Sequence, residues 1–434
     1  MTPTLTTIVT TIVKTSGLRI AGLSLLALSL TAAAEPVAYV GATLHPVSGE
    51  PIEQGVVLVR DGRIEALGAD VAVPEEATRV DLSGQHVYPG LIHAGTVLGL
   101  TEIGSVAGTD DTTETGQINA AIRAEIAVNH DSMLFAPNAS NGLLTAHVVP
   151  RGGLIRGSSA VIALAGWNWE EMTLRAPAGM HIAFPRGAAD EEENDDLVLL
   201  DRVLDQARAW AGAMEAHRSG EAPRPAPNDQ FAALAPLLAG EQRLFLHADD
   251  EDDMNAALDW AARQGFENLA LVGGPDLQHV AGRLAANGID AVLTGVHVMP
   301  ERAWESYDAA YIAASRLAEA GVRFAITDGG SGFTAGNARH IPFHAGMAVA
   351  FGLTEQDAIK SVTQWPAEIL GVGEELGTLE PGKRATFFTT DGSPLEATTQ
   401  VLGAWIDGEA YDFSRDRQRQ LYERYRNRPR AAAL

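Results

Sequence analysis

Two short apolar segments of the chain are each followed directly by a side chain that could bind a metal or move a proton. Residues 244–246 precede His247, and residues 324–327 precede Asp328. Imidazole and carboxylate groups are the usual metal ligands and acid–base groups at the ends of buried strands. Each residue also has a plainer interpretation. His247 could be a strand-end histidine held by hydrogen bonds, and Asp328, which two glycines follow, could cap a turn.

Further polar residues could contribute to such a site. His340 and His344 follow the second segment closely and are predicted to line the site. Asp110, with the neighbouring Asp111 and Glu114, lies in a region without regular patterning and could reach the mouth of the site. An acidic loop is more often simply solvated. Because His340 and Asp110 could both reach the opening of the site, we take them as the candidate substrate-binding residues.

Several chemistries are excluded by what the sequence lacks. There is no cysteine, so disulfides, thiolate metal sites and cysteine nucleophiles are absent. The glycines at 152, 153 and 157 are not followed by Lys-Ser or Lys-Thr, and no Gly-x-Ser-x-Gly occurs, which argues against nucleotide binding and serine hydrolysis. The net charge of −25 would repel a phosphate backbone, so nucleic acid is not expected as a partner.

The first 34 residues have the pattern of a cleavable secretory signal peptide. Lys14 and Arg19 are their only charges, an apolar run covers residues 20–30, and small residues precede Glu35. The run is too short for a comfortable membrane span, although an uncleaved anchor is the alternative. We expect a periplasmic or secreted protein that does not associate with a membrane after cleavage.

The middle of the chain alternates short apolar strands with helices, which predicts a parallel sheet with helical crossovers. The number of units favours an α/β fold of the closed (β/α)8, TIM-like class over an open sheet. Strands are expected at 143–149, 181–184, 244–247, 269–272, 291–293 and 324–327, and helices at 195–218, 230–238, 252–264, 276–287, 309–320 and 354–370. Residues 105–141 fit no such unit and are interpreted as an insertion.

Both ends of the mature chain instead show short strands and turns. Asp61-Gly62 between apolar runs is a hairpin signal. We predict one small β-sandwich domain built from both ends. The expected order is a signal peptide (1–34), the first part of the small domain (35–88), the barrel (89–375), the second part (376–413) and a C-terminal helix or tail (414–434).

This organisation resembles the amidohydrolase superfamily. The resemblance rests on the junction Tyr88-Pro89-Gly90-Leu91-Ile92, on the block 363–371 that resembles the family's last barrel helix, and on 376–385 that resembles its return to the small domain. The insertion and the segments 150–155 and 166–170 resemble a secreted bacterial subgroup. Family members hydrolyse C–N or similar bonds with metal-activated water.

The resemblance also implies a ligand set, which this sequence matches only in part. Asp328 falls where the family's catalytic aspartate lies, and His247 matches its strand-5 histidine. The first-strand histidine pair is replaced by Gly95 and Val97, with His93 shifted by two residues. The three lysines lie at 14, 360 and 383, so no strand-4 lysine can bridge two metals, and strand 6 has no histidine.

Two hypotheses follow from the sequence. The first is an exported hydrolase that acts on a C–N bond of a small cyclic amide or peptide-like compound through one divalent ion, most simply zinc. His247 and Asp328 would hold the metal, with His93 or His344 as the further ligand, and Asp328 would be the acid–base group. The second is a degenerate barrel that binds a ligand or partner without catalysis, either as a homo-oligomer or paired with a related amidohydrolase.

Overall fold

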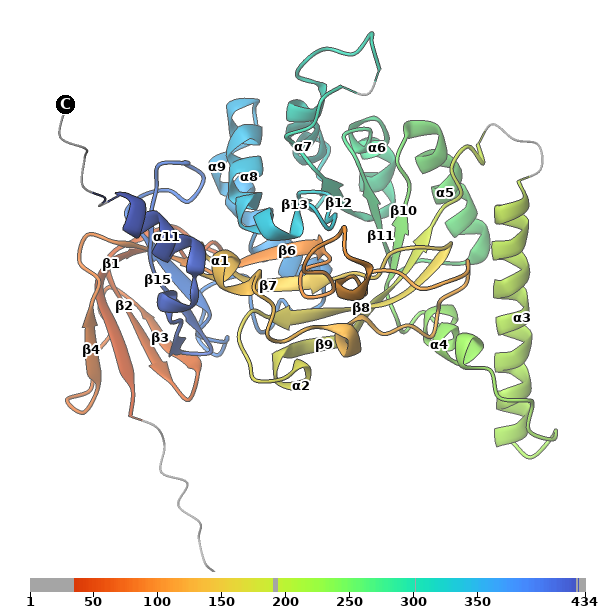
Figure 1. Ribbon diagram of the computed structural model, residues 1–434, viewed down its shortest axis with the longest axis horizontal. Helices are drawn as coiled ribbons and strands as arrows, with labels where there is room; N and C mark the ends of the chain where they lie inside the picture. The colour runs from red at the N-terminus through yellow and green to blue at the C-terminus, as the bar shows by residue number, and fades with distance from the viewer. Residues whose placement is uncertain (1–34, 190–193, 301, 427, 429–434) are drawn as a thin grey trace, which may run out of the picture. The chain divides into compact units, whose positions relative to one another are not determined.

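The computed structural model describes residues 35–189, 194–300, 302–426 and 428, and is shown in Figure 1. The predicted signal peptide lies outside these residues. Within the described part, no helix combines the length and the apolar character that a membrane crossing requires.

The two ends of the chain form one eight-stranded sheet, ordered β16-β15-β14-β5-β1-β2-β3, with β4 paired to β1. Its strands are β1 (Val37–Leu44), β2 (Ile52–Arg60), β3 (Arg63–Gly68), β4 (Thr78–Asp81), β5 (His86–Pro89), β14 (Phe387–Thr390), β15 (Val401–Ile406) and β16 (Glu409–Ala410). The junction between the two ends is antiparallel pairing of β5 with β14.

This sheet curls back on itself instead of forming two separate sheets. The rings of Tyr39 on β1 and Trp405 on β15 are 5.1 Å apart, although two strands lie between theirs. Three steps across a flat sheet would separate them by roughly 14 Å. Both rings also contact Phe387, in an apolar core shared by the two chain ends. The sandwich-like core is thus enclosed by one hydrogen-bonded sheet.

The middle of the chain forms a second eight-stranded sheet, ordered β13 to β6 in reverse sequence order, which makes a nearly closed barrel. Its strands are β6 (Leu91–Thr96), β7 (Leu143–Val148), β8 (Ile155–Ala163), β9 (Thr173–Ala183), β10 (Leu244–His247), β11 (Leu269–Gly273), β12 (Asp290–Thr294) and β13 (Phe324–Thr327). The α/β barrel expected from the sequence is confirmed, and the strands from β9 to β13 are parallel.

One barrel strand departs from the all-parallel expectation. β8 runs antiparallel to both β7 and β9. Only residues 149–154 join β7 to β8, whereas a parallel crossover needs about a dozen residues or more. Because β8 is reversed, its first residues lie beside the carboxyl ends of β7 and β9.

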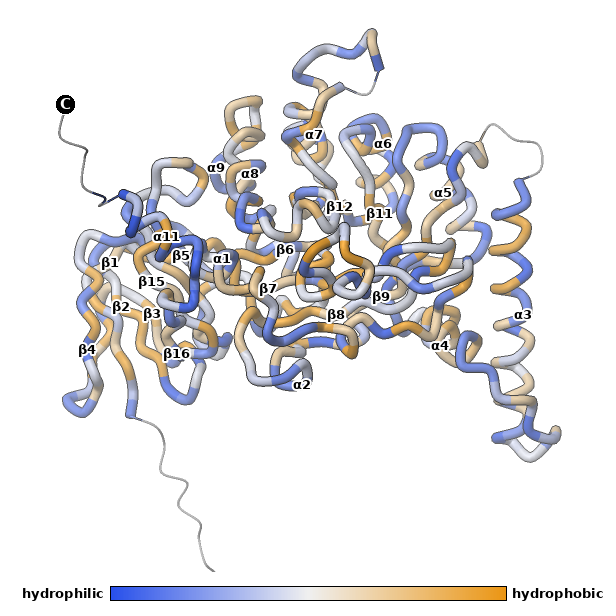
Figure 2. The backbone as a smooth tube through the Cα atoms, in the orientation of Figure 1, coloured by the Kyte–Doolittle hydropathy of each residue, from blue (hydrophilic) through white to orange (hydrophobic). Residues whose placement is uncertain are grey.

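The helices are α1 (Phe135–Ala139), α2 (Trp169–Met172), α3 (Asp195–Arg218), α4 (Asp229–Leu238), α5 (Glu251–Gln264), α6 (Leu277–Asn287), α7 (Ala309–Glu319), α8 (Ile341–Ala350), α9 (Glu355–Lys360), α10 (Gln364–Ile369) and α11 (Arg417–Arg426). In α3, Leu200, Val203, Leu204 and Ala207 are buried, which is the spacing of one helix face. Figure 2 shows the corresponding alternation of hydrophobic and hydrophilic turns along α3. The predicted insertion contains α1 and two short 3-10 helices.

The helix predicted at 354–370 is divided into α9 and α10, and the residues between them bond to two barrel strands. The edge strands β6 and β13 are not paired with each other. Instead, Ile92 N–H donates to the Val362 carbonyl and Ile326 N–H donates to the Ser361 carbonyl. The break between the helices therefore bridges one end of the seam where the barrel would otherwise stay open.

Candidate active site

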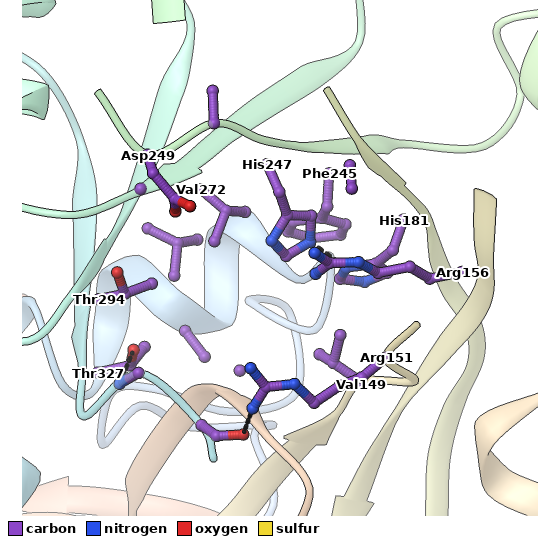
Figure 3. Close-up of a pocket in the computed structure, with 18 of the residues that line it drawn as sticks. Val149, Arg151, Arg156, His181, Phe245, His247, Asp249, Val272, Thr294 and Thr327 are labelled. Atoms are coloured by element: carbon purple, nitrogen blue, oxygen red, sulfur yellow. Dashed lines mark hydrogen bonds between the residues drawn. The ribbon is translucent and has the colours of Figure 1, made fainter. Parts of the chain in front are cut away.

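A cavity of about 230 Å³ opens at the carboxyl ends of the barrel strands, where sites of this architecture lie. Its wall includes the ends of β10 to β13, with His247, Val272, Thr294 and Thr327 facing inward (Figure 3). Gly95 and Val97, the positions without the expected histidines, also line it. We call this cavity the central pocket.

Two histidines form a pair in the wall of the central pocket. His247 ends β10, and His181 lies on the neighbouring strand β9, opposite Phe245; His247 Nε2 and His181 Nδ1 are 2.9 Å apart. His181 also stacks on Phe245, with ring centroids 4.8 Å apart. Burial, followed by the nearby charges of Arg156 and Arg151, lowers the pKa of His247 well below its usual value. Burial, followed by His247, lowers the pKa of His181 in the same direction. Both rings are therefore neutral at physiological pH.

A third histidine inside the barrel is fully satisfied by its neighbours. His147 Nδ1 lies 2.9 Å from the Ala94 carbonyl, and its Nε2 lies 2.7 Å from the Ser159 hydroxyl. A carbonyl only accepts, so Nδ1 carries the proton and Nε2 accepts from the hydroxyl. Burial lowers the pKa of His147 to about 4. His147 is a structural residue of the barrel interior.

Two arginines also line the central pocket, Arg151 after β7 and Arg156 on β8. Arg151 Nη1 donates to the Gly330 carbonyl at 2.8 Å, while the buried Arg156 Nε has no acceptor. These arginines and His181 were not predicted from the sequence as residues of the site. A usable signal was present, because a charged residue at 156 interrupts an otherwise small and apolar strand.

Asp328, the expected acid–base residue, lies outside the lining of the central pocket. Its backbone neighbours Thr327 and Gly329 line the pocket, but its Oδ1 is hydrogen-bonded to His93 Nε2 at 3.0 Å. Asp328 Oδ1 also accepts from Gly330 N–H at 2.9 Å. Burial raises the pKa of Asp328, but the His93 imidazole and the Gly330 N–H together lower it below its ordinary value.

The bond between His93 and Asp328 spans the open seam of the barrel. His93 belongs to β6, whereas Asp328 directly follows β13, and neither side chain is appreciably exposed. His93 does not line the pocket, because the neighbouring positions Ile92 and Ala94 pack in the barrel interior and the strand alternates. The pair therefore links β6 to the end of β13 directly, beside the bonds that Ile92 and Ile326 make to Val362 and Ser361.

The remaining predicted residues also lie away from the central pocket. His344 on α8 accepts at Nδ1 from Val296 N–H and stacks on His297 at 4.4 Å. Burial lowers the pKa of His344 to about 4. His340 lines a smaller cavity beside Phe343. Asp110 Oδ1 accepts from the backbone and hydroxyl of Thr112, which uses the carboxylate locally to fix a turn.

Comparison with known proteins connects this architecture to one family. Residues 279–411 match the family model described as the amidohydrolase family. The chain is 23% identical to amidohydrolase tasK of Hapsidospora irregularis over 401 residues, which cover 83% of this chain but only 39% of that longer protein. It is 27% identical to an imidazolonepropionase of Acidiphilium cryptum, with 82% and 90% of the two chains covered.

A solved structure shares the fold over nearly its whole length. The crystal structure of an amidohydrolase from Thermotoga maritima superposes with a TM-score of 0.78 at 23% identity, and covers 87% of this chain and 99% of that one. These matches support the amidohydrolase superfamily as the group to which this chain is related. The family match and the relatives support a hydrolase that acts on carbon–nitrogen bonds.

Members of this superfamily usually bind divalent metals, but the donors present here do not fit one. His247 Nε2 and His181 Nδ1 face each other, and both nitrogens of His147 are occupied. His181 Nε2 is buried without a partner among the described residues, but one such nitrogen does not make a ligand set. Asp328, His93 and His344 cluster at the seam, away from His247. Among the described residues, no three histidine or carboxylate side chains could hold a metal together. The predicted ligand set, His247 and Asp328 with His93 or His344, is therefore not assembled among the described residues.

Proposed function

We propose that this protein is an exported hydrolase that cleaves a carbon–nitrogen bond in a small cyclic amide or peptide-like compound bound in the central pocket. The observation that carries the proposal is the pair of neutral histidines, His247 and His181, in a pocket at the carboxyl ends of the barrel strands. That is the place where barrel enzymes bring their reacting groups together.

His247 takes the acid–base role in this proposal, in place of Asp328. A neutral imidazole can accept a proton from an attacking water and return it to the leaving nitrogen. His181, at 2.9 Å, holds the ring of His247 in one orientation. Thr294 and Thr327 bring hydroxyl groups to the opposite wall, where they can donate to the carbonyl oxygen.

The expected zinc ion is left out of this chemistry. The sequence allowed at most a mononuclear site, and we propose that the site is reduced further, to one without a resident metal. The support is that His247 Nε2 and His181 Nδ1 point at each other and not at a common point in the pocket. Elemental analysis of the purified protein tests this. Stoichiometric zinc that survives dialysis, and is lost from His247→Asn, would contradict it.

Hydrolysis is tested with a panel of cyclic amides, ureas and acylated amino acids, measured with and without added zinc. We expect turnover without the metal, and a loss of about a hundredfold or more in His247→Asn because a general base is removed. His217→Asn, at the end of α3, is the matched control and should retain full activity. Equal activity of His247→Asn and the control would refute the role of His247.

Export is a separate part of the proposal and rests on the pattern of residues 14–34. Expression of the full chain in a bacterium with a periplasm should give a product whose first residue lies near Glu35. N-terminal sequencing that starts at Met1 would contradict export.

The second candidate is a binding module without turnover, alone as a homo-oligomer or paired with a related amidohydrolase. It is favoured by Gly95 and Val97, which line the pocket where the family's histidines are expected. Ligands from the same panel would then bind but remain intact. Light scattering, alone and with a related amidohydrolase added, tests the pairing.

A further inference from the structure

The two arginines of the central pocket carry positive charge, which the Asp249 carboxylate offsets only in part at Arg156. Arg151 lies in the connection between β7 and β8, Arg156 is the second residue of β8, and both line the pocket. Figure 3 shows the Arg156 side chain running beside His247 and His181, with the Arg151 side chain below it. Among the described side chains, no carboxylate forms an ion pair with either guanidinium.

The carboxylates that do line the central pocket are already engaged. Asp249 forms an ion pair with Arg186 at 2.5 Å. Asp253 accepts from the backbone N–H groups of Gly187 and Ala189. An anion in the pocket would therefore meet two guanidinium groups, in a chain whose overall net charge is −25.

Arg156 also has an unmet hydrogen bond. Its Nε is a donor that cannot act as an acceptor, and it is buried without a partner. Leaving such a group unpaired lowers the stability of the folded protein, and more so where the group is charged. Arg151 is held by its bond to Gly330 but keeps further N–H groups for a ligand.

We propose that the substrate of this pocket is a small molecule with a carboxylate group, which Arg156 and Arg151 bind while its amide lies against the histidine pair. The inference rests on the proposed function, because it names the substrate class of that site. Guanidinium groups match the geometry of carboxylates and pair with them through two parallel hydrogen bonds. A phosphate ester presents similar oxygens, and the experiment separates the two.

The test measures binding, so that it does not depend on turnover. Ligand-observed NMR is run on matched sets in which one cyclic amide or acylated amino acid carries a carboxylate, its neutral carboxamide or a phosphate monoester. We expect binding at millimolar concentration for carboxylates and not for their carboxamides. Binding confined to phosphate esters, binding of the neutral forms alone, or no binding of any carboxylate would overturn the inference.

Variants assign the binding to the arginines. Arg156→Met and Arg151→Met should each weaken carboxylate binding by about ten- to a hundredfold, the value of one charged hydrogen bond. Arg156→Lys should recover part of the loss because it keeps the charge. Arg316→Met, which removes an exposed ion pair on α7, is the control and should bind normally.

Stability gives a second readout that a purely structural role would not produce. Because Arg156 Nε is buried without an acceptor, Arg156→Met should raise the melting temperature of the ligand-free protein while it weakens binding. A lowered melting temperature with unchanged binding would make Arg156 a structural residue and sink the inference. If carboxylates bind but are not hydrolysed, only the proposed hydrolase function is wrong. If neutral amides alone are hydrolysed, only the inference of a carboxylate-bearing substrate is wrong.

Discussion

At the scale of single residues, the protein uses its histidines in two different ways. His247 and His181 face the central pocket, whereas His93 and His147 are enclosed by partners that fix their rings. Sequence position alone could not separate these roles, because all four lie in barrel strands or at their ends. What separates them is the partner of each ring nitrogen, which depends on residues far away in the chain.

The seam pair gives the first prediction. Asp328→Ala removes the acceptor of His93 and leaves a fully buried imidazole nitrogen unpaired, so the free energy of unfolding should fall by about 1–3 kcal/mol. Asp328→Asn, which keeps an acceptor oxygen, should lose less. Urea unfolding measures both.

Asp205→Ala serves as the control for this prediction, because it removes an exposed ion pair that contributes under about 1 kcal/mol. If Asp328→Ala proved as stable as that control while hydrolysis was abolished, Asp328 would be the acid–base residue expected from the sequence, and the seam role would be wrong.

At the scale of elements, the sequence predicted the regular half of the barrel closely. The strands ending at His247 and Thr327 and the long helix α3 have the predicted bounds, because short apolar runs, caps and one buried helix face specify them locally. β8 was missed because Arg156, Gly157 and two serines interrupt its apolar run. Arg156 lines the pocket and Ser159 bonds His147 inside the barrel, whereas Ser158 bonds the Ile122 carbonyl of the insertion. Hydrophobicity therefore does not alternate with a period of two along this part of the strand.

The position of β8 depends on a glycine, which gives the second prediction. Gly157 has φ +111°, and a Cβ atom there would lie 2.8 Å from the Ile122 carbonyl oxygen. Gly157→Ala should therefore destabilise the protein by more than about 1 kcal/mol and weaken carboxylate binding through the adjacent Arg156.

Gly212→Ala is the matched control for Gly157→Ala. Gly212 lies within α3, where an added Cβ would meet nothing within 4 Å, so alanine should stabilise the helix by up to about 1 kcal/mol. Thermal unfolding compares the two. If the two variants had equal melting temperatures, the insertion around Ile122 would be able to move away from the added Cβ, and the close contact would not fix the position of β8.

At the scale of the whole molecule, the candidate site could be predicted only as a location. The family resemblance and the strand order placed it at the carboxyl ends of the barrel strands, and the structure has its pocket there. Its chemistry could not be predicted, because β8 is reversed and its first residues, including Arg156, lie at the pocket. In an all-parallel barrel the last residues of this strand would lie there instead. The charge of the pocket is thus a consequence of topology.

The buried histidines together give the last prediction, on acid stability. Burial lowers the pKa of His45, His147 and His344 to about 4, and that of His181 and His247 well below 6.5. As the pH falls below 6.5, the unfolded chain binds protons at these rings and the folded protein does not. Unfolding is therefore favoured increasingly between pH 6.5 and 4, by about 1.4 kcal/mol per pH unit for each fully buried ring.

Urea unfolding across this window should show a steep loss of stability that begins near pH 6.5, whereas the lowered pKa of Asp328 adds a loss only below its ordinary value of 3.8. His147→Asn separates the causes, because it should be less stable at neutral pH yet lose stability more slowly on acidification. His45→Asn, at a half-buried site, should change the slope less because solvent screens it. A stability that stays level between pH 6.5 and 4 would mean that the barrel interior admits protonated imidazoles, and the assignment of His247 as a neutral base would fail with it.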